Sequence, residues 1–140
     1  MVEVPRLLCF YGEGEDLPHP VLTEALTALN DHYAAELGKR FVAAGLCYYR
    51  DGRDSVAWHG DRIGRSRTTD TMIAILSLGA TRRLLLRPRG GGASLPLNLG
   101  QGDLIVMGGS CQRTWEHSLP KTARPTGARI SVQFRVRGVR

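Results

Sequence analysis

Cysteine is scarce in this chain, and its placement excludes the usual cysteine-based architectures. The 140 residues contain only three cysteines, Cys9, Cys47 and Cys111. The number is odd, the residues are widely spaced, and no Cys-x-x-Cys pair occurs. This pattern excludes a disulfide framework and a zinc knuckle, and it favours a reducing compartment. We therefore expect a cytoplasmic protein.

Long hydrophobic runs are also missing. No run approaches the roughly 18 apolar residues that a membrane span requires. The first residues, Met1 to Arg6, lack the cationic region and apolar stretch of a signal peptide. Internal repeats, coiled-coil heptads and linkers are absent as well. A length of 140 residues suits one domain. We expect a single domain over residues 1–140, a monomer with no membrane partner.

Acidic residues are fewer than basic ones. Thirteen Asp and Glu oppose nineteen Lys and Arg, which gives a formal net charge of +6. Such a surface suits an anionic partner, nucleic acid first, but it also serves solubility alone. The same two interpretations apply to the local basic clusters, which either hold phosphates or form a solvated surface: Arg62, Arg65 and Arg67, and Arg82, Arg83, Arg87 and Arg89.

The pattern of apolar residues predicts one helix followed by many short strands. Apolar residues recur at steps of three and four over 20–37, Pro20 suits the first turn, and Gly38 ends the segment. Glycine is abundant, with 17 residues, which favours tight turns. The sequence therefore predicts a mainly β fold with one supporting helix, a jelly roll or barrel. The predicted strands are 44–49, 55–61, 71–78, 81–87, 95–99, 103–107, 112–118 and 128–136.

The clearest chemical motif is His59-Gly60-Asp61. In an extended strand, residues two apart point to the same side, so His59 and Asp61 present an imidazole and a carboxylate together. His117, on a later strand, is the best candidate for a third ligand. Two histidines and one carboxylate on one face of a metal are typical of non-haem Fe(II) oxygenases. The alternative is that all three are ordinary hydrogen-bonding, turn and strand-end residues.

The last predicted strand alternates strictly between apolar and polar residues. Arg129, Ser131, Gln133 and Arg135 share one face, which is either solvated or lines a barrel interior. Buried arginines need anions, because an unpaired guanidinium is costly to bury. The two arginine backbones lie roughly 20 Å apart at 3.3 Å per residue, so both side chains can lean toward the ends of a short dicarboxylate. A dicarboxylic 2-oxo acid would also chelate the metal.

Four segments together resemble the AlkB family of Fe(II)/2-oxoglutarate-dependent dioxygenases. They are Tyr49 to Asp61, Ile75 to Gly79, Gly102 to Gly109 and Arg129 to Arg135, with Pro5-Arg6 and Tyr11-Gly12 ahead of them. The resemblance implies a double-stranded β-helix, or jelly-roll, core. It also implies O₂ as co-substrate and the removal of alkyl groups from damaged nucleobases in DNA, single-stranded or flipped out, or in RNA, which is a DNA-repair activity.

The resemblance implies roles for individual residues as well. Iron would be held by His59, Asp61 and His117, and 2-oxoglutarate would be contacted by Tyr49, Arg129 and Arg135. Two asparagines of the family are replaced here, by Cys47 and by Ser131, and Ser131 partly substitutes as a hydrogen-bonding group. Family members carry further residues before Pro5-Arg6, so we expect the nucleotide-gripping lid to be missing.

Substrate contacts are predicted from strand alternation. Trp115 shares the face of His117 and is the candidate for stacking on a base, Trp58 is expected in the core, and Arg62 and Arg65 are candidates for phosphate contacts. Two alternatives remain open. One is a dioxygenase of the same fold that acts on RNA, a nucleotide or a protein. The other is a nucleic-acid-binding module with little or no catalysis.

Overall fold

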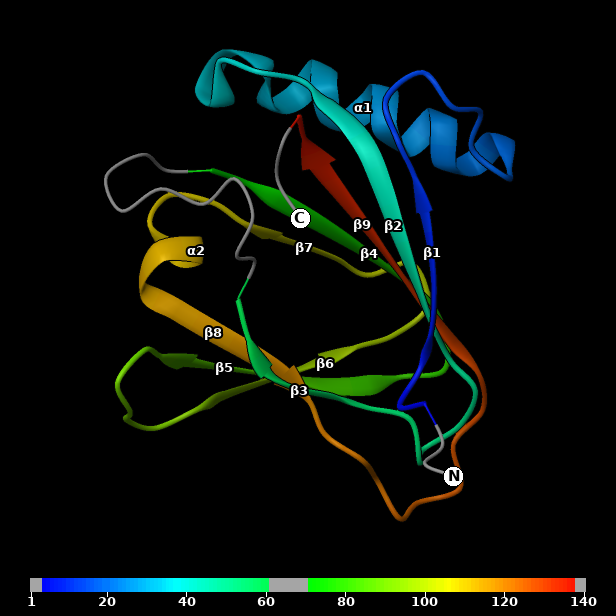
Figure 1. Cartoon of the computed structure of the whole chain (residues 1–140), viewed down its shortest axis with the longest axis vertical. Helices are drawn as coiled ribbons and strands as arrows, with labels where there is room; N and C mark the ends of the chain where they lie inside the picture. The colour runs from blue at the N-terminus through cyan, green and yellow to red at the C-terminus, as the bar shows by residue number, and fades with distance from the viewer. Residues whose placement is uncertain (1–3, 61–70, 138–140) are drawn as a thin grey trace.

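The computed structural model describes residues 4–60 and 71–137, which form two antiparallel sheets facing each other (Figure 1). The larger sheet has the strand order β1-β2-β9-β4-β7, and the smaller sheet has the order β3-β8-β5-β6. This arrangement confirms the prediction of a mainly β double-stranded β-helix. The strands are β1 (Leu7–Tyr11), β2 (Phe41–Tyr49), β3 (Val56–His59), β4 (Ile73–Gly79), β5 (Arg82–Pro88), β6 (Leu95–Leu99), β7 (Leu104–Met107), β8 (Trp115–Leu119) and β9 (Arg129–Val136).

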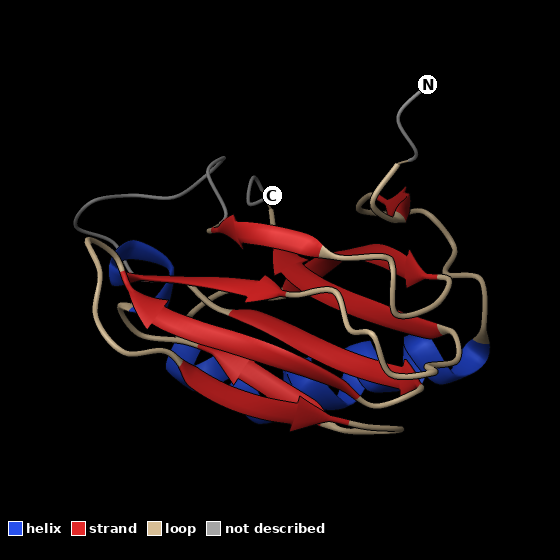
Figure 2. Ribbon diagram, turned by 90° about the horizontal axis from the view of Figure 1, so that it is seen from below, coloured by secondary structure: helices blue, strands red, loops and turns tan. Residues whose placement is uncertain are grey.

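The predicted helix is α1 (Pro20–Leu37), which covers the face of the larger sheet that points away from the smaller one (Figures 1 and 2). Its bounds agree with the prediction, because Gly38 takes the left-handed conformation, with φ 68°, that ends a helix. Leu22 and Leu29 are buried in the main hydrophobic core. Burial of these side chains supplies most of the helix's stability, since in proteins the packing of an apolar face contributes more to helix stability than intrinsic propensity does.

One buried polar residue of α1 was not predicted. The Asn30 side chain is 4% exposed and binds the backbone of Phe41 twice. Phe41 N donates to Asn30 Oδ1 over 2.7 Å, and Asn30 Nδ2 donates to Phe41 O over 3.0 Å. A buried amide is stable only with such partners. Asn30 therefore fixes the start of β2 against the helix.

The two faces of β9 have different surroundings. Val132 and Phe134 are fully buried in the core beneath α1. The alternate residues from Arg129 to Arg135 point the other way, into the space between the sheets. The sequence left open whether this polar face is solvated or lines the interior, and the structure has it in the interior.

The structure differs from the strand predictions in several places. Strand β1 was not predicted, because its five residues, LLCFY, lack the apolar-polar alternation of a half-buried strand. Residues 112–114 were predicted as strand but belong to the short helix α2 (Cys111–Thr114), where Thr114 N donates to Ser110 O over 2.9 Å. Strand β3 ends at His59, and position 61 lies outside the described residues. In the described part of the chain, no helix has the length and apolarity needed to cross a membrane.

Candidate functional site

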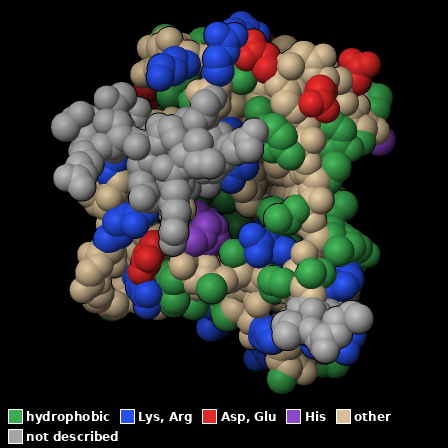
Figure 3. All heavy atoms as spheres, in the orientation of Figure 1, with side chains coloured by type: hydrophobic (Ala, Val, Ile, Leu, Met, Phe, Trp, Pro, Cys, Tyr) green, Lys and Arg blue, Asp and Glu red, His purple; other side chains and the backbone are tan. Residues whose placement is uncertain are grey.

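A cavity of about 440 Å³ lies between the two sheets. The polar face of β9 forms one wall, β1 and β2 extend it, and β3 and β8 contribute from the opposite sheet. Figure 3 shows a hollow on this side of the molecule with a histidine side chain in it. Most of the predicted site residues line this one cavity: Tyr49, His59, His117, Arg129, Ser131 and Arg135.

The two histidines face each other across a strand pair. His59 lies opposite His117 in the register of β3 and β8, and their ring centroids are 4.2 Å apart. Residues directly opposite in an antiparallel pair have side chains on the same face. His59 Nδ1 lies 2.8 Å from Ala57 O, so Nδ1 carries the proton that is donated. Metal-ligating histidines commonly donate one ring N–H to a backbone carbonyl in this way, which makes the other ring nitrogen, here Nε2, the candidate ligand atom.

Burial determines the charge state of the second histidine. His117 is 7% exposed, and burial, together with the neighbouring His59 and Arg135, lowers its pKa to about 3. Its imidazole is therefore neutral near pH 7. A histidine must be neutral to ligate a metal, and imidazole ligands suit a divalent transition ion such as Fe(II). The pair therefore fits the predicted iron site.

Part of the predicted site cannot be placed. Asp61, Arg62 and Arg65 lie outside the described residues. Within residues 4–60 and 71–137, no group of three metal-binding side chains gathers. Two of the three predicted ligands are thus brought together, and the carboxylate stays a prediction.

The two tryptophans differ in what they contact. Trp115 is half-buried and pairs with Pro88, and in the described structure it does not line the cavity. The prediction that Trp58 belongs to the core is wrong. Its ring is half-buried and lies 3.9 Å beneath the Arg87 guanidinium, whose Nε donates to Glu116 over 2.6 Å. Arg87 is thereby engaged within the protein and does not point freely toward a phosphate.

A second group of polar side chains surrounds Tyr49, the last residue of β2. Tyr49 is 2% exposed, and two guanidinium groups lie near its ring, Arg129 at 5.3 Å and Arg82 at 5.7 Å from the centroid. Burial is the largest cause that raises the pKa of Tyr49 to about 12. The hydroxyl is therefore protonated and can donate a hydrogen bond to a carboxylate.

Arg129 is almost completely buried, at 2% exposed. Its Nη2 donates to Ser77 Oγ over 2.9 Å, while its Nε is buried and has no hydrogen-bond partner among the described residues. Burial lowers the pKa of Arg129. A buried guanidinium with an unused N–H fits a carboxylate, because the planar fork binds two oxygens.

Two residues beside Arg135 shape this wall and were not predicted as site residues. At Gly45, an added Cβ would lie 2.9 Å from Arg135 Nη1, so the glycine leaves room for the guanidinium. Gln133 Oε1 accepts a hydrogen bond from Arg135, and Gln133 Nε2 lies 3.6 Å from Cys47 Sγ. The polar alternation of β9 indicated Gln133, but no sequence signal identified Gly45.

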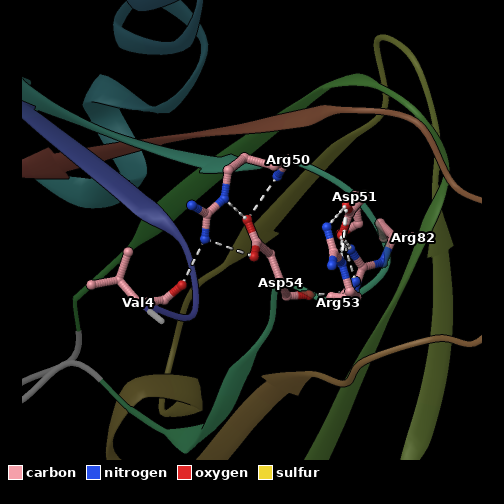
Figure 4. A network of polar contacts seen from close by, with 6 residues as sticks. All are labelled: Val4, Arg50, Asp51, Arg53, Asp54 and Arg82. Carbon is pink, nitrogen blue, oxygen red and sulfur yellow. Dashed lines mark hydrogen bonds and ion pairs between the residues drawn. The ribbon is translucent and has the colours of Figure 1, made fainter. Parts of the chain in front are cut away.

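Arg82 is also engaged inside the protein, although it was included among the basic clusters. It is 3% exposed and donates to three carbonyl oxygens, of Asp51 (3.1 Å), Asp54 (2.9 Å) and Pro120 (2.8 Å). The Asp54 carboxylate accepts from Arg50 over 2.8 and 3.0 Å, and these bonds lower its pKa. Figure 4 shows this network, which fastens the turn between β2 and β3. Tyr49 and His59 are thereby held at the two ends of one braced connection.

Comparison with known proteins agrees with this geometry. Residues 13–135 match the family model described as the 2OG-Fe(II) oxygenase superfamily. The chain is 31% identical over 150 residues to human alpha-ketoglutarate-dependent dioxygenase alkB homolog 3, covering 94% of this chain and 51% of the relative. It is 34% identical over 140 residues to DNA oxidative demethylase ALKBH2 of Arabidopsis thaliana, covering 84% and 43%. The chain thus spans about half the length of the curated relatives it matches.

A solved structure supports the fold alone. A prolyl-4-hydroxylase of Pseudomonas putida superposes with a TM-score of 0.58 at 17% sequence identity. The match covers 94% of this chain and 72% of that one.

Proposed function

We propose that this chain, which belongs to the 2OG-Fe(II) oxygenase superfamily and within it to the AlkB family, removes alkyl groups oxidatively from nucleobases. One observation carries the proposal. A single cavity joins a pair of facing imidazoles to a wall that carries Arg129 and Arg135. The first feature suits a divalent metal and the second suits an anionic co-substrate.

His59 and His117 would hold Fe(II), with Asp61 as the predicted third ligand. When bound, iron supplies the activation of O₂, coupled to the conversion of 2-oxoglutarate to succinate and CO₂. The hydrogen bond from His59 Nδ1 to Ala57 O orients that ring and leaves Nε2 for the metal. The low pKa of His117, about 3, keeps the second ring available as a ligand at neutral pH.

Arg129, Tyr49 and Arg135 would bind 2-oxoglutarate. Arg135 acts on the pKa of His117 and therefore lies toward the histidine pair. Arg129 and Tyr49 lie side by side at another part of the wall. This separation supports an arrangement in which one carboxylate of 2-oxoglutarate binds near Arg135 and the other binds between Arg129 and Tyr49. Ser131 is 2% exposed and lies between the two arginines on the same face of β9. It adds a hydroxyl group to this wall of the cavity.

A nucleic-acid substrate is supported by charge and by the relatives. The net charge of +6 favours a polyanion, and the names of two relatives specify a dioxygenase of the alkB group and a DNA oxidative demethylase. A base inside a duplex cannot reach the cavity, so the target would be single-stranded or flipped out. Hydroxylation of the alkyl carbon gives a hemiaminal, which splits into an aldehyde and the unmodified base. Trp115, Arg62 and Arg65 remain the candidates for substrate contacts.

The decisive experiment measures succinate and formaldehyde from a methylated single-stranded DNA oligonucleotide with Fe(II), 2-oxoglutarate and O₂. We expect equal amounts of both products, and we expect His117→Ala to lose both products and to lose Mn²⁺ binding. The matched control is His32→Ala, an exposed helix residue, which should behave as wild type. Formaldehyde from methylated RNA or a methylated peptide but not from DNA would refute the DNA substrate. Salt-sensitive oligonucleotide binding without succinate would refute catalysis.

A further inference from the structure

Arg6 directly precedes β1, and the strand register indicates that it lies opposite Tyr49. In the register of β1 and β2, Leu7 lies opposite Tyr48 and Leu8 opposite Cys47. One further step of the same register brings Arg6 opposite Tyr49. Tyr49 in turn lies opposite Arg129 in the register of β2 and β9. Arg6, which directly precedes β1, thus forms a transverse row with Tyr49 of β2 and Arg129 of β9.

All three side chains of this row point into the cavity. Residues directly opposite in antiparallel strands share a face, and Arg6, Tyr49 and Arg129 all line the cavity wall. The next inward-facing row, two residues further along each strand, is Leu8, Cys47 and Ser131, which also lines it. That neighbouring row contains no amide and no cation.

The two arginines of the row have unused donors of the same kind. The Nε atoms of Arg6 and Arg129 are buried and have no hydrogen-bond partner among the described residues. None of the described residues that line the cavity is acidic. A buried donor without a partner is destabilising. An anion bound at this row would accept hydrogen bonds from both of these donors.

The backbone just before Arg6 is anchored, which gives the side chain a fixed origin. Pro5 O accepts a hydrogen bond from Ser55 N over 2.8 Å. Val4 O accepts one from Arg50 Nη2 over 2.7 Å (Figure 4). Both bonds tie the segment to the braced turn between β2 and β3. Pre-organisation of this kind lowers the entropy lost when a ligand is bound.

We propose that Arg6 binds the carboxylate of 2-oxoglutarate that lies farther from the histidine pair, together with Arg129 and the Tyr49 hydroxyl. The inference rests on the proposed function, because it assigns a further residue to the same co-substrate site. Two guanidinium groups and a phenol can donate to both oxygens of one carboxylate. Arg6 thus makes the site specific for a dicarboxylic 2-oxo acid over one with a neutral tail.

The experiment compares the binding of two 2-oxo acids to the protein loaded with Mn²⁺ in place of iron, followed by calorimetry. One ligand is 2-oxoglutarate, and the other is 2-oxopentanoate, which has the same chain length and no second carboxylate. We expect Arg6→Ala to weaken 2-oxoglutarate binding by about 10- to 100-fold, the range for losing hydrogen bonds to a charged group. The affinity for 2-oxopentanoate should not change. Arg6→Lys keeps the positive charge but not the planar guanidinium, and it should recover part of the affinity for 2-oxoglutarate that Arg6→Ala loses.

Two controls separate this inference from folding and from the proposed function. Arg137→Ala removes an arginine that is 80% exposed and paired with Glu13, and it should leave both affinities at the wild-type value. Circular dichroism checks that each variant is folded, and Arg6→Gln serves if alanine disturbs β1. If wild type binds 2-oxoglutarate and all Arg6 variants bind it equally well, the role of Arg6 is refuted and the proposed function stands. If wild type binds no 2-oxoglutarate, both are refuted.

Discussion

Replacing Arg82 by methionine tests whether the hydrogen bonds of this residue stabilise the turn between β2 and β3, which connects Tyr49 to His59. Methionine keeps much of the length and apolar volume of the side chain but removes all three hydrogen bonds. The carbonyl oxygens of Asp51, Asp54 and Pro120 would then lack their charged partner. Since Arg82 is 3% exposed, water replaces these bonds poorly.

The expected loss of stability follows from the three hydrogen bonds that Arg82 donates. A hydrogen bond to a charged group contributes about 1.5–3 kcal/mol. Methionine avoids the cost of burying the guanidinium, whose pKa is lowered by that burial. We therefore expect the free energy of unfolding to fall by about 3–5 kcal/mol rather than by the full sum. At about 2–4 °C per kcal/mol for a domain near this size, the melting temperature should fall by roughly 10 °C.

The assay is urea unfolding followed by circular dichroism, with thermal melting as a second measurement. Arg83→Met is the matched control, because Arg83 is the next residue of β5 and is exposed. We expect it to change the free energy of unfolding by no more than about 0.5 kcal/mol. A decrease in the free energy of unfolding below about 1 kcal/mol in Arg82→Met would contradict this prediction, because the loss of three hydrogen bonds to a largely buried guanidinium should cost more.

Three further predictions follow from single contacts. Asp54→Asn should remove part of the acid sensitivity of folding. Arg50 lowers the Asp54 pKa below its ordinary 3.8, so the stabilisation is present above that pH and is lost as the pH falls through the folded-state pKa; unfolding curves from pH 6 to pH 2 measure it. Asn30→Ala should destabilise by about 2–3 kcal/mol in urea unfolding, because two buried hydrogen bonds to Phe41 are lost. Gly45→Ala should raise the KM for 2-oxoglutarate several-fold, because the new Cβ displaces Arg135.

Each of these predictions has a control and an outcome that contradicts it. Asp16→Asn changes an exposed carboxylate. If it reduces the pH dependence of the free energy of unfolding as much as Asp54→Asn does, the role assigned to Asp54 is refuted. Asn98→Ala removes an exposed amide, and an equal effect on stability would mean that the Asn30 bonds contribute nothing. Gly127→Ala adds a methyl group 3.8 Å from Ala80, and an equal rise in KM would show that displacement of Arg135 is not the cause.

Local patterns in the sequence predicted the elements and part of the site. The 3.6-residue period and the Pro20 and Gly38 signals predicted α1 with its observed bounds. Alternation predicted β9 within one residue. The family segments identified His59, Tyr49, Arg129 and Arg135, and the search for a third metal ligand identified His117; all five line one cavity. These predictions succeed because each depends on residues close together in the chain.

The residues that were missed depend on distant partners. Arg82 was included among the basic clusters, and only the folded chain buries it and brings it three carbonyl partners, two from the turn between β2 and β3 and one from Pro120. Trp58 was assigned to the core, but Arg87 from another strand covers it outside the main core. Asn30 was not predicted, because its partner, the Phe41 backbone, lies beside it only in the folded chain.

The sequence by itself determined the helix, most strands, the two-faced character of β9 and the residue types that suit a metal and a dicarboxylate. Only the tertiary structure decided that the polar face of β9 points inward, that His59 and His117 lie opposite each other, and that Arg6 joins Tyr49 and Arg129 in one row. The physical reason is that a strand's own periodicity specifies which residues share a face. Pairing and sheet packing between distant segments specify what that face meets.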